Sequence, residues 1–264
     1  MDNYVDERDY KIIEGDKYTF TVFPKIISMK CQVLFSDHKR LIIAFTGRPF
    51  PAWIWCADDA STNEMETAYK ITTEALPLTD GYFYIMKYNL AEYFIQRSKE
   101  EGKALSIKTN MLAYDCQTPI QPSDIADGEL HQCDINDIDE IVEFTDLFHK
   151  AIDMDQESLD TYRKNVEENI DKNCFFFWKN KEGKAVASCR LNLFSEPLMS
   201  VGAVYTKEEY RRKHYAQNLV YHVTMLVKEK GYIPTLYTDA DYVASNACYE
   251  KIGYTLKGKV CRLG

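Results

Sequence analysis

Strand-like and helix-like segments alternate along the second half of the chain. Apolar residues with helical spacing occupy residues 135–151, 156–170 and about 212–230, and a shorter helical segment spans 244–251. Apolar runs that suit strands lie around them, at 174–179, 185–194, 199–206, 235–238 and 254–261. With one further strand expected before the first helix, the order is β-α-α-β-β-β-α-β-α-β, which is typical of an α/β domain.

A break precedes this pattern. Pro119 and Pro122 lie close together and are followed by Gly128, and two such prolines suit neither the interior of a helix nor a central strand. At about 150 residues per domain, a chain of 264 residues accommodates two small domains. We therefore expect an N-terminal domain over residues 1–122 and a second domain over residues 123–264.

The first part carries a fainter copy of the same plan. Residues 90–101 suit a helix that ends at Gly102 before a strand at 105–107, just as the long helix of the second part ends at Gly231 before the next strand. We interpret the first part as an α+β domain that is a degenerate repeat of the second. The alternative is chance, because basic helix ends with glycine caps are common. The aromatic runs at 53–55 and 82–84 are expected mainly in its core.

The composition excludes some classes of protein. The chain has 41 acidic and 32 basic residues and a net charge of −9, whereas a nucleic-acid-binding surface needs a basic surplus that neutralises phosphates. No apolar run approaches the roughly 18 residues of a membrane helix. The first residues lack the basic and apolar regions of a signal peptide. We expect a cytoplasmic protein that binds neither nucleic acid nor membrane.

The cysteines and histidines show no spacing typical of metal ligands. The eight cysteines include no C-x-x-C pair, and the five histidines are scattered. Buried reduced thiols are the ordinary state of such cysteines in a cytosolic protein. We therefore expect no metal site. The sequence is compatible with a homo-oligomer.

One segment departs from what helix stability alone favours. Residues 204–206 end a strand, and Arg211, Arg212 and Lys213 stand at the expected start of the long helix. The amino end of a helix has unpaired N–H groups and the positive end of the helix dipole, so it disfavours basic residues and binds anions. The segment therefore indicates a site for a phosphate-bearing ligand, with a solvated basic turn as the alternative.

This segment resembles the acyl-CoA-binding motif Q/R-x-x-G-x-G/A of the GNAT superfamily of N-acetyltransferases. Arg211 matches the first position and Ala216 the last, whereas His214 replaces the glycine of the fourth. Downstream, residues 245–254, with Asn246 and Tyr249, resemble the second signature of the family. Together, in this order and on strands and helices, the two motifs make residues 128–264 similar to one GNAT domain. The resemblance implies an α/β GNAT acyl-CoA N-acyltransferase fold in the C-terminal domain.

The resemblance also implies roles for individual residues. The arm of acetyl-CoA would pair with the backbone of Val204, Tyr205 and Thr206 and would accept a hydrogen bond from Asn246. The pyrophosphate would be held, next to Arg211, by the N–H groups of Arg212, Lys213, His214, Tyr215, Ala216 and Gln217. We expect His214, as a first-turn residue, to have helical backbone angles that any side chain allows. Tyr249 would stand near the sulfur of the cofactor.

The implied activity is transfer of an acetyl group from acetyl-CoA to a primary amine of a small molecule or peptide. A strand N–H would stabilise the charge that develops on the thioester oxygen, and the Tyr249 hydroxyl would protonate the thiolate as general acid. The sequence assigns no general base among its carboxylate candidates Glu196, Glu208, Glu209 and Asp239. Because the first domain lacks an equivalent phosphate segment, one cofactor site is expected.

Two other functions are compatible with these motifs. A non-catalytic acyl-CoA-binding or regulatory protein would explain both His214 in place of glycine and the unassigned base. Acyl transfer from aminoacyl-tRNA is disfavoured by the acidic charge, because a tRNA partner needs a basic groove.

Overall fold

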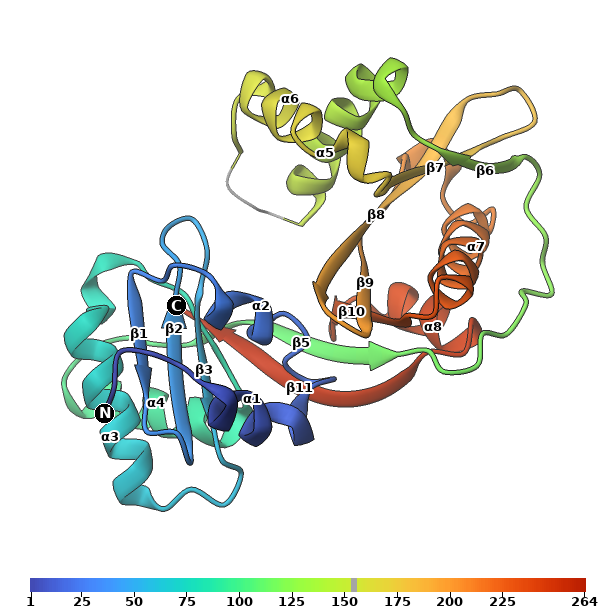
Figure 1. Cartoon of the computed structure of the whole chain (residues 1–264). Helices are drawn as coiled ribbons and strands as arrows, with labels where there is room; N and C mark the ends of the chain where they lie inside the picture. The colour runs from blue at the N-terminus through green and yellow to red at the C-terminus, as the bar shows by residue number, and fades with distance from the viewer. Residues whose placement is uncertain (153–155) are drawn as a thin grey trace. The chain divides into compact units, whose positions relative to one another are not determined.

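The computed structural model, which describes residues 1–152 and 156–264, divides into two compact units (Figure 1). Unit 1 comprises Met1–Tyr114, Tyr237–Val243 and Leu256–Gly264, and unit 2 comprises Asp115–Leu236 and Ala244–Thr255. Two segments from the end of the chain join the first unit. Strand pairing over such a distance leaves no local signal in the sequence.

Unit 1 is a mixed sheet with helices on both of its faces. Its elements within the first part of the chain are α1 (Glu7–Ile13), α2 (Phe23–Ser28), β1 (Val33–Ser36), β2 (Leu41–Phe45), β3 (Ala52–Cys56), α3 (Thr62–Ala75), β4 (Tyr84–Met86), α4 (Tyr88–Glu100) and β5 (Ile107–Asp115).

The last strand of the chain completes this sheet. The strand order in unit 1 is β1-β2-β3-β4-β11-β5, where β11 is Thr255–Leu263. β11 runs antiparallel to β4, with Cys261 opposite Met86 and Leu263 opposite Tyr84. The chain therefore returns to its first unit after forming the second.

Two apolar clusters hold unit 1 together, one on each face of the sheet. Strand β2 is buried along its whole length, so alternate residues serve both clusters. Leu41, Ile43 and Phe45 face α3 and α4, and Ile42 and Ala44 face α1 and α2. The expectation that residues 53–55 belong to the core is confirmed, because these side chains are at most 6% exposed, whereas in the run 82–84 only Tyr84 is buried.

A buried histidine fastens the N-terminal segment to unit 1. His38 Nδ1 lies 2.7 Å from Asp9 Oδ2, and His38 Nε2 lies 3.0 Å from Asp2 Oδ2. Asp9 is fully buried and also accepts a hydrogen bond from Ser36 Oγ. The hydrogen bond to Asp9 raises the pKa of His38 above its ordinary value, although burial opposes the shift. The imidazolium form donates from both ring nitrogens, which matches two carboxylate partners.

We expect the attachment of this N-terminal segment to weaken as the pH rises. A raised histidine pKa contributes stability that is complete below the ordinary value of 6.5 and is lost as the pH rises through the folded-state value. Hydrogen exchange of α1 at mildly acidic and mildly alkaline pH measures this effect. His38→Asn, which tolerates the left-handed φ of +57° at this position, should remove the pH dependence. The same pH dependence in both proteins would contradict the role given to His38.

Unit 2 contains the α/β pattern expected from the sequence. Its elements are β6 (Glu129–Gln132), α5 (Ile138–Ala151), α6 (Leu159–Glu167), β7 (Phe175–Lys179), β8 (Ala185–Ser195), β9 (Leu198–Thr206), α7 (Tyr215–Glu229), β10 (Ile233–Asp239) and α8 (Val243–Lys251). Its strand order is β10-β9-β8-β7-β6, and β10 continues into unit 1 after Leu236.

Alternation along β7 shows how the faces of this sheet are covered. Phe177 contacts Phe144 of α5, with ring centroids 5.0 Å apart. Its neighbour Trp178 contacts His222 of α7 at 5.6 Å. Successive strand residues point to opposite faces, so α5 and α7 cover opposite faces of the sheet.

The predicted helices and strands of this half are confirmed with small shifts at their ends. α5, α6 and α7 each begin about three residues later than predicted, and α7 begins at Tyr215 rather than at about Arg212. The first strand of the predicted order, for which no residue range was predicted, is the short edge strand β6, which pairs with β7. In the part of the chain that the structure describes, no helix is both long and apolar enough to cross a bilayer.

Candidate active site

A bulge and a split in the sheet of unit 2 lie where the acyl-CoA motif begins. Between the pairs Arg190–Gly202 and Ser188–Tyr205, β9 has one residue more than β8, which is a β-bulge. Ala203 at this bulge has a φ of +49°. β9 also pairs in parallel with β10, but only from Leu198 to Ser200. Beyond Ser200, β9 therefore continues with β8 alone as its partner in this register.

The predicted strand residues Val204, Tyr205 and Thr206 all lie beyond the split. Tyr205 is 8% exposed and packs against Phe144. Its neighbours on β9 are half-buried. Because only one edge of this stretch pairs with β8, the other edge is the side on which an extended ligand would add as a strand.

The loop before α7 has strained backbone angles that the sequence did not indicate. Arg212 and His214 have φ values of +62° and +63°, and His214 is the residue that caps α7. The expectation of helical angles at His214 is therefore wrong. The left-handed region favours glycine, which has no Cβ, so the glycine of the motif has a physical reason here. Together with Ala203, three non-glycine residues with positive φ lie within residues 203–214, and such clusters mark functional sites.

The amino end of α7 presents backbone donors. The first hydrogen bond of the helix runs from the N–H of Asn218 to the carbonyl of His214 at 3.0 Å. The N–H groups of Tyr215, Ala216 and Gln217 thus have no acceptor within the helix. In the described residues, no side chain caps this end. The arrangement suits an anion.

The basic residues lie before this helix, not in its first turn. Arg212 and Lys213 are exposed, and Arg212 forms no ion pair with any residue that the structure describes. Arg211 is already engaged, because its Nε donates to the carbonyl of Thr206 at 3.2 Å and its Nη1 lies 3.5 Å from Glu208. We therefore expect Arg211 to fix the loop and Arg212 and Lys213 to supply the free positive charge.

Asp124 and Asp127, in the segment before β6, pack on α7. The sequence analysis did not predict these contacts. Tyr215 donates to Asp127 Oδ1 at 2.5 Å, and this hydrogen bond raises the pKa of Tyr215 to about 12. Asn218 donates to the carbonyl of Asp124 at 2.9 Å. The Asp124 carboxylate lies 3.9 Å from His214 Nδ1. An acidic side chain therefore stands next to the anion-binding end of α7, where it opposes binding of a phosphate.

The second signature forms α8, and its two predicted residues are buried. Asn246 is 9% exposed and Tyr249 is 8% exposed. The Tyr249 ring packs edge-on against Tyr254, with centroids 6.1 Å apart. Burial, with smaller contributions from Cys248 and Cys189, raises the pKa of Tyr249 far above its ordinary value. A tyrosine hydroxyl is already protonated at neutral pH at its ordinary pKa of 10.0, and the upward shift makes the proton harder to donate.

The carboxylate candidates for a general base are not gathered around this site in unit 2. Glu196, Glu208 and Glu209 are all exposed. Glu208 pairs with Arg211, and Glu196 accepts from Tyr232 at 3.4 Å. Asp239 belongs to unit 1. No base is assigned.

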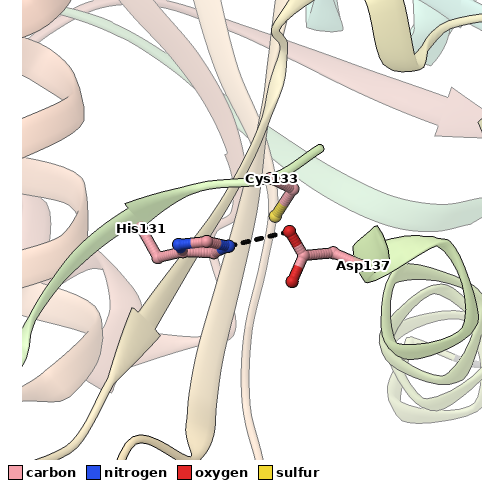
Figure 2. A group of neighbouring side chains, drawn as sticks. All are labelled: His131, Cys133 and Asp137. Atoms are coloured by element: carbon pink, nitrogen blue, oxygen red, sulfur yellow. Dashed lines mark hydrogen bonds and ion pairs between the residues drawn. The ribbon is translucent and has the colours of Figure 1, made fainter. Parts of the chain in front are cut away.

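The fold also brings together a set of possible metal ligands that the sequence spacing did not indicate. The ligand atoms of His131, Cys133 and Asp137 lie within 4.8 Å of one another (Figure 2). Asp137 Oδ2 accepts from His131 Nε2 at 2.7 Å and from the N–H of Asp134 at 2.9 Å, and Oδ1 lies 3.4 Å from Lys179 Nζ. Burial raises the pKa of the Cys133 thiol. Three donors already bind the Asp137 carboxylate. We therefore interpret the cluster as stabilising the start of α5, and we assign no metal to it.

Comparison with known proteins agrees with this architecture. Among solved structures, the chain is similar to an acetyltransferase from the GNAT family of Colwellia psychrerythraea, with a TM-score of 0.62, 12% identity and coverage of 99% of this chain and 98% of that chain. It is similar to a GCN5-related N-acetyltransferase from Kribbella flavida, with a TM-score of 0.64, 14% identity and coverage of 96% and 95%. It also resembles a GCN5-related N-acetyltransferase-like protein from Streptococcus suis, with a TM-score of 0.59, 14% identity and 97% coverage of both chains.

These similarities extend over both units, so the whole chain has an α/β architecture of the GNAT type. Residues 139–254 match the family model described as Acetyltransferase (GNAT) family. Residues 139–254 therefore form the part of the chain that matches a GNAT acetyltransferase domain. No curated protein matched the sequence.

Proposed function

We propose that this protein transfers the acetyl group of acetyl-CoA to a primary amine of a small molecule or peptide. The observation that carries the proposal is the split of β9 from β10, followed by the amino end of α7. A strand with one unpaired edge and a helix end with free N–H groups suit a ligand that has an extended amide-containing arm and a pyrophosphate.

In this proposal the backbone of Val204, Tyr205 and Thr206 pairs with the arm of acetyl-CoA. The pyrophosphate lies at the amino end of α7, where Arg212 and Lys213 add positive charge. Asn246 contacts the arm from α8. A backbone N–H of β9 near the bulge stabilises the charge that develops on the thioester oxygen.

Tyr249 supplies the proton for the departing thiolate. It lies on α8 of the same unit, and its hydroxyl carries a proton at neutral pH. The attacking amine must be neutral, and an ordered water is the simplest acceptor for its proton, since the carboxylate candidates in unit 2 are exposed. Holding the amine and the thioester together supplies much of the remaining rate enhancement.

We also infer that unit 1 is a degenerate copy that binds no acyl-CoA. The elements β4, α4 and β5 follow one another as β9, α7 and β10 do in unit 2. In unit 1, however, β11 lies between β4 and β5. The position at which a ligand would add as a strand is thus already taken by the chain itself.

A cytoplasmic location belongs to the same proposal. All eight cysteines are free thiols, and most of them are buried. Free thiols persist in a reducing compartment.

A non-catalytic acyl-CoA-binding protein is the second candidate. His214 holds a left-handed conformation that glycine adopts at lower cost, and Asp124 lies beside it. Both features weaken phosphate binding relative to a glycine-containing loop. Binding of acetyl-CoA without transfer to any amine would favour this candidate.

Calorimetric titration with acetyl-CoA and with free CoA tests the proposed site. We expect the double variant R212Q/K213Q to bind both ligands about 5- to 10-fold more weakly, because two exposed charges next to the pyrophosphate are lost. The effect should shrink at high salt. Lys230→Gln, at the opposite end of α7, is the matched control and should bind normally.

Absence of binding in the unmodified protein would remove the proposed function. Unchanged affinity in R212Q/K213Q would place the cofactor elsewhere. His214→Gly should bind more tightly than the unmodified protein if the strained loop holds the pyrophosphate.

A further inference from the structure

Arg190 lies in the middle of the sheet of unit 2 and has no counter-ion among the residues that the structure describes. It lies on β8, half-buried, with its guanidinium over the ring of Phe175 at 4.9 Å. Its Nη1 lies 3.5 Å from Asn165 Oδ1, at the limit of a hydrogen bond. Its Nε is shielded from solvent and has no hydrogen-bond partner among residues 1–152 and 156–264. No carboxylate in the same residues lies within 4.0 Å of the guanidinium.

This arrangement is unfavourable for the free protein. Arginine stays charged at any physiological pH, and a buried donor without an acceptor costs as much as a lost hydrogen bond. Most arginines of the chain are paired, for example Arg97 with Glu66 and Arg163 with Asp139. The stacking on Phe175 offsets part of the cost but supplies no acceptor for the Nε proton.

The surface next to Arg190 has room for a ligand. Gly202 of β9 is opposite Arg190 in the sheet, so both face the same side. A Cβ at Gly202 would meet only the amide nitrogen of Asn192, at 3.7 Å. Asn192 follows Arg190 by two residues on β8 and shares its face. Gly202 directly precedes the bulge at Ala203, where the proposed acyl transfer takes place.

The geometry points to the binding of an acceptor's anionic group by Arg190. Nη1 is directed to Asn165 and Nε is shielded from solvent, so Nη2 is the guanidinium nitrogen that remains for an incoming carboxylate. We propose that the acceptor amine carries a carboxylate that pairs with Arg190 above Gly202. The inference rests on the proposed function, since it names the class of acceptor for that site: amines that are also anions.

Matched amines test this assignment by turnover. Acetyl transfer is followed as release of CoA thiol, with amines supplied as free acid and as amide: glycine and glycinamide, and γ-aminobutyrate and its amide. In Arg190→Gln, kcat/KM for the acids should fall about 10- to 100-fold, whereas the amides should change by less than about 3-fold. Comparing variant with unmodified protein for each amine cancels differences in amine pKa.

Arg262→Gln is the matched control. Arg262 of β11 is also half-buried, stacks on Phe83 at 4.5 Å and has a buried Nε without a described partner, but it belongs to unit 1. The R262Q variant should leave the ratio of acid to amide turnover unchanged. Equal losses for acids and amides in R190Q, or the same change of ratio in R262Q, would overturn the proposal.

A binding measurement separates this inference from the proposed function. The buried Nε–H of Arg190 should give a resolved proton–nitrogen NMR signal, identified by its loss in R190Q. Titration with acetate should shift that signal saturably and leave the Arg262 signal in place. A larger shift with inorganic phosphate than with acetate would mean that the anionic group of the acceptor is a phosphate and not a carboxylate. If no amine is acetylated but acetate still binds, the transfer function fails and the anion site stands. If neither acetate nor phosphate shifts the Arg190 signal, the anion site is overturned.

Discussion

Replacement of Tyr249 by phenylalanine is expected to lower kcat for acetyl transfer by about 10²-fold, with little change in the affinity for acetyl-CoA. The change removes one hydroxyl and keeps the ring, so the edge-on contact with Tyr254 is preserved. If the hydroxyl protonates the thiolate, its loss acts only in the transition state. Steady-state kinetics combined with calorimetric binding of acetyl-CoA measures both quantities.

The pH profile of the unmodified enzyme provides a second measure of the same role. Burial raises the pKa of Tyr249 above its ordinary value of 10.0. A general acid must be protonated, so kcat should show no falling limb that belongs to Tyr249 below that pH. Tyr254→Phe is the control, because this neighbouring hydroxyl is engaged with Thr224 at 2.7 Å. An unchanged kcat in Y249F would remove Tyr249 as the acid and leave the proton to water.

Removal of residues 256–264 is expected to unfold unit 1. These residues form most of β11, and Val260, Cys261 and Leu263 are fully buried. At about 1.5–3 kcal/mol for each large buried side chain, their loss approaches the 5–15 kcal/mol that stabilises a typical domain. The truncation also leaves the edge of β4 without its partner strand.

Hydrogen exchange and limited proteolysis of the truncated chain measure this effect. Protection should disappear from β2, β3 and β4, whereas β7, β8 and α7 of unit 2 should stay protected. Leu256→Ala is the control on the same strand, because Leu256 is 45% exposed, and it should change stability little. A truncated chain with intact protection in unit 1 would show that β11 is dispensable for it.

Much of unit 2 could be predicted because its signals are local. The helical spacing in α5 and α7 follows from short-range periodicity. The resemblance of residues 204–216 and 245–254 to two family motifs was enough to select the GNAT fold. The family match at 139–254 and the similar solved structures bear that out.

The details of the site depended on features that leave weaker traces in the sequence. Ala203 at the bulge and His214 before α7 both have positive φ. A glycine at these positions would have indicated positive φ from the sequence, whereas alanine and histidine do not. The three basic residues before α7 looked like its first turn because basic residues are good helix formers. The helix instead begins after His214, so these three residues lie outside it.

The sequence by itself determined the class of the second unit, the order of its elements and the residues of its two motifs, because each depends on neighbours within a few turns of chain. Only the tertiary structure decided that β11 closes the sheet of unit 1, that Asp124 stands beside His214, and that Arg190 lies opposite Gly202 with no counter-ion in the described part of the chain. Those outcomes depend on strand register and on contacts between residues far apart in the chain, which side-chain periodicity does not specify.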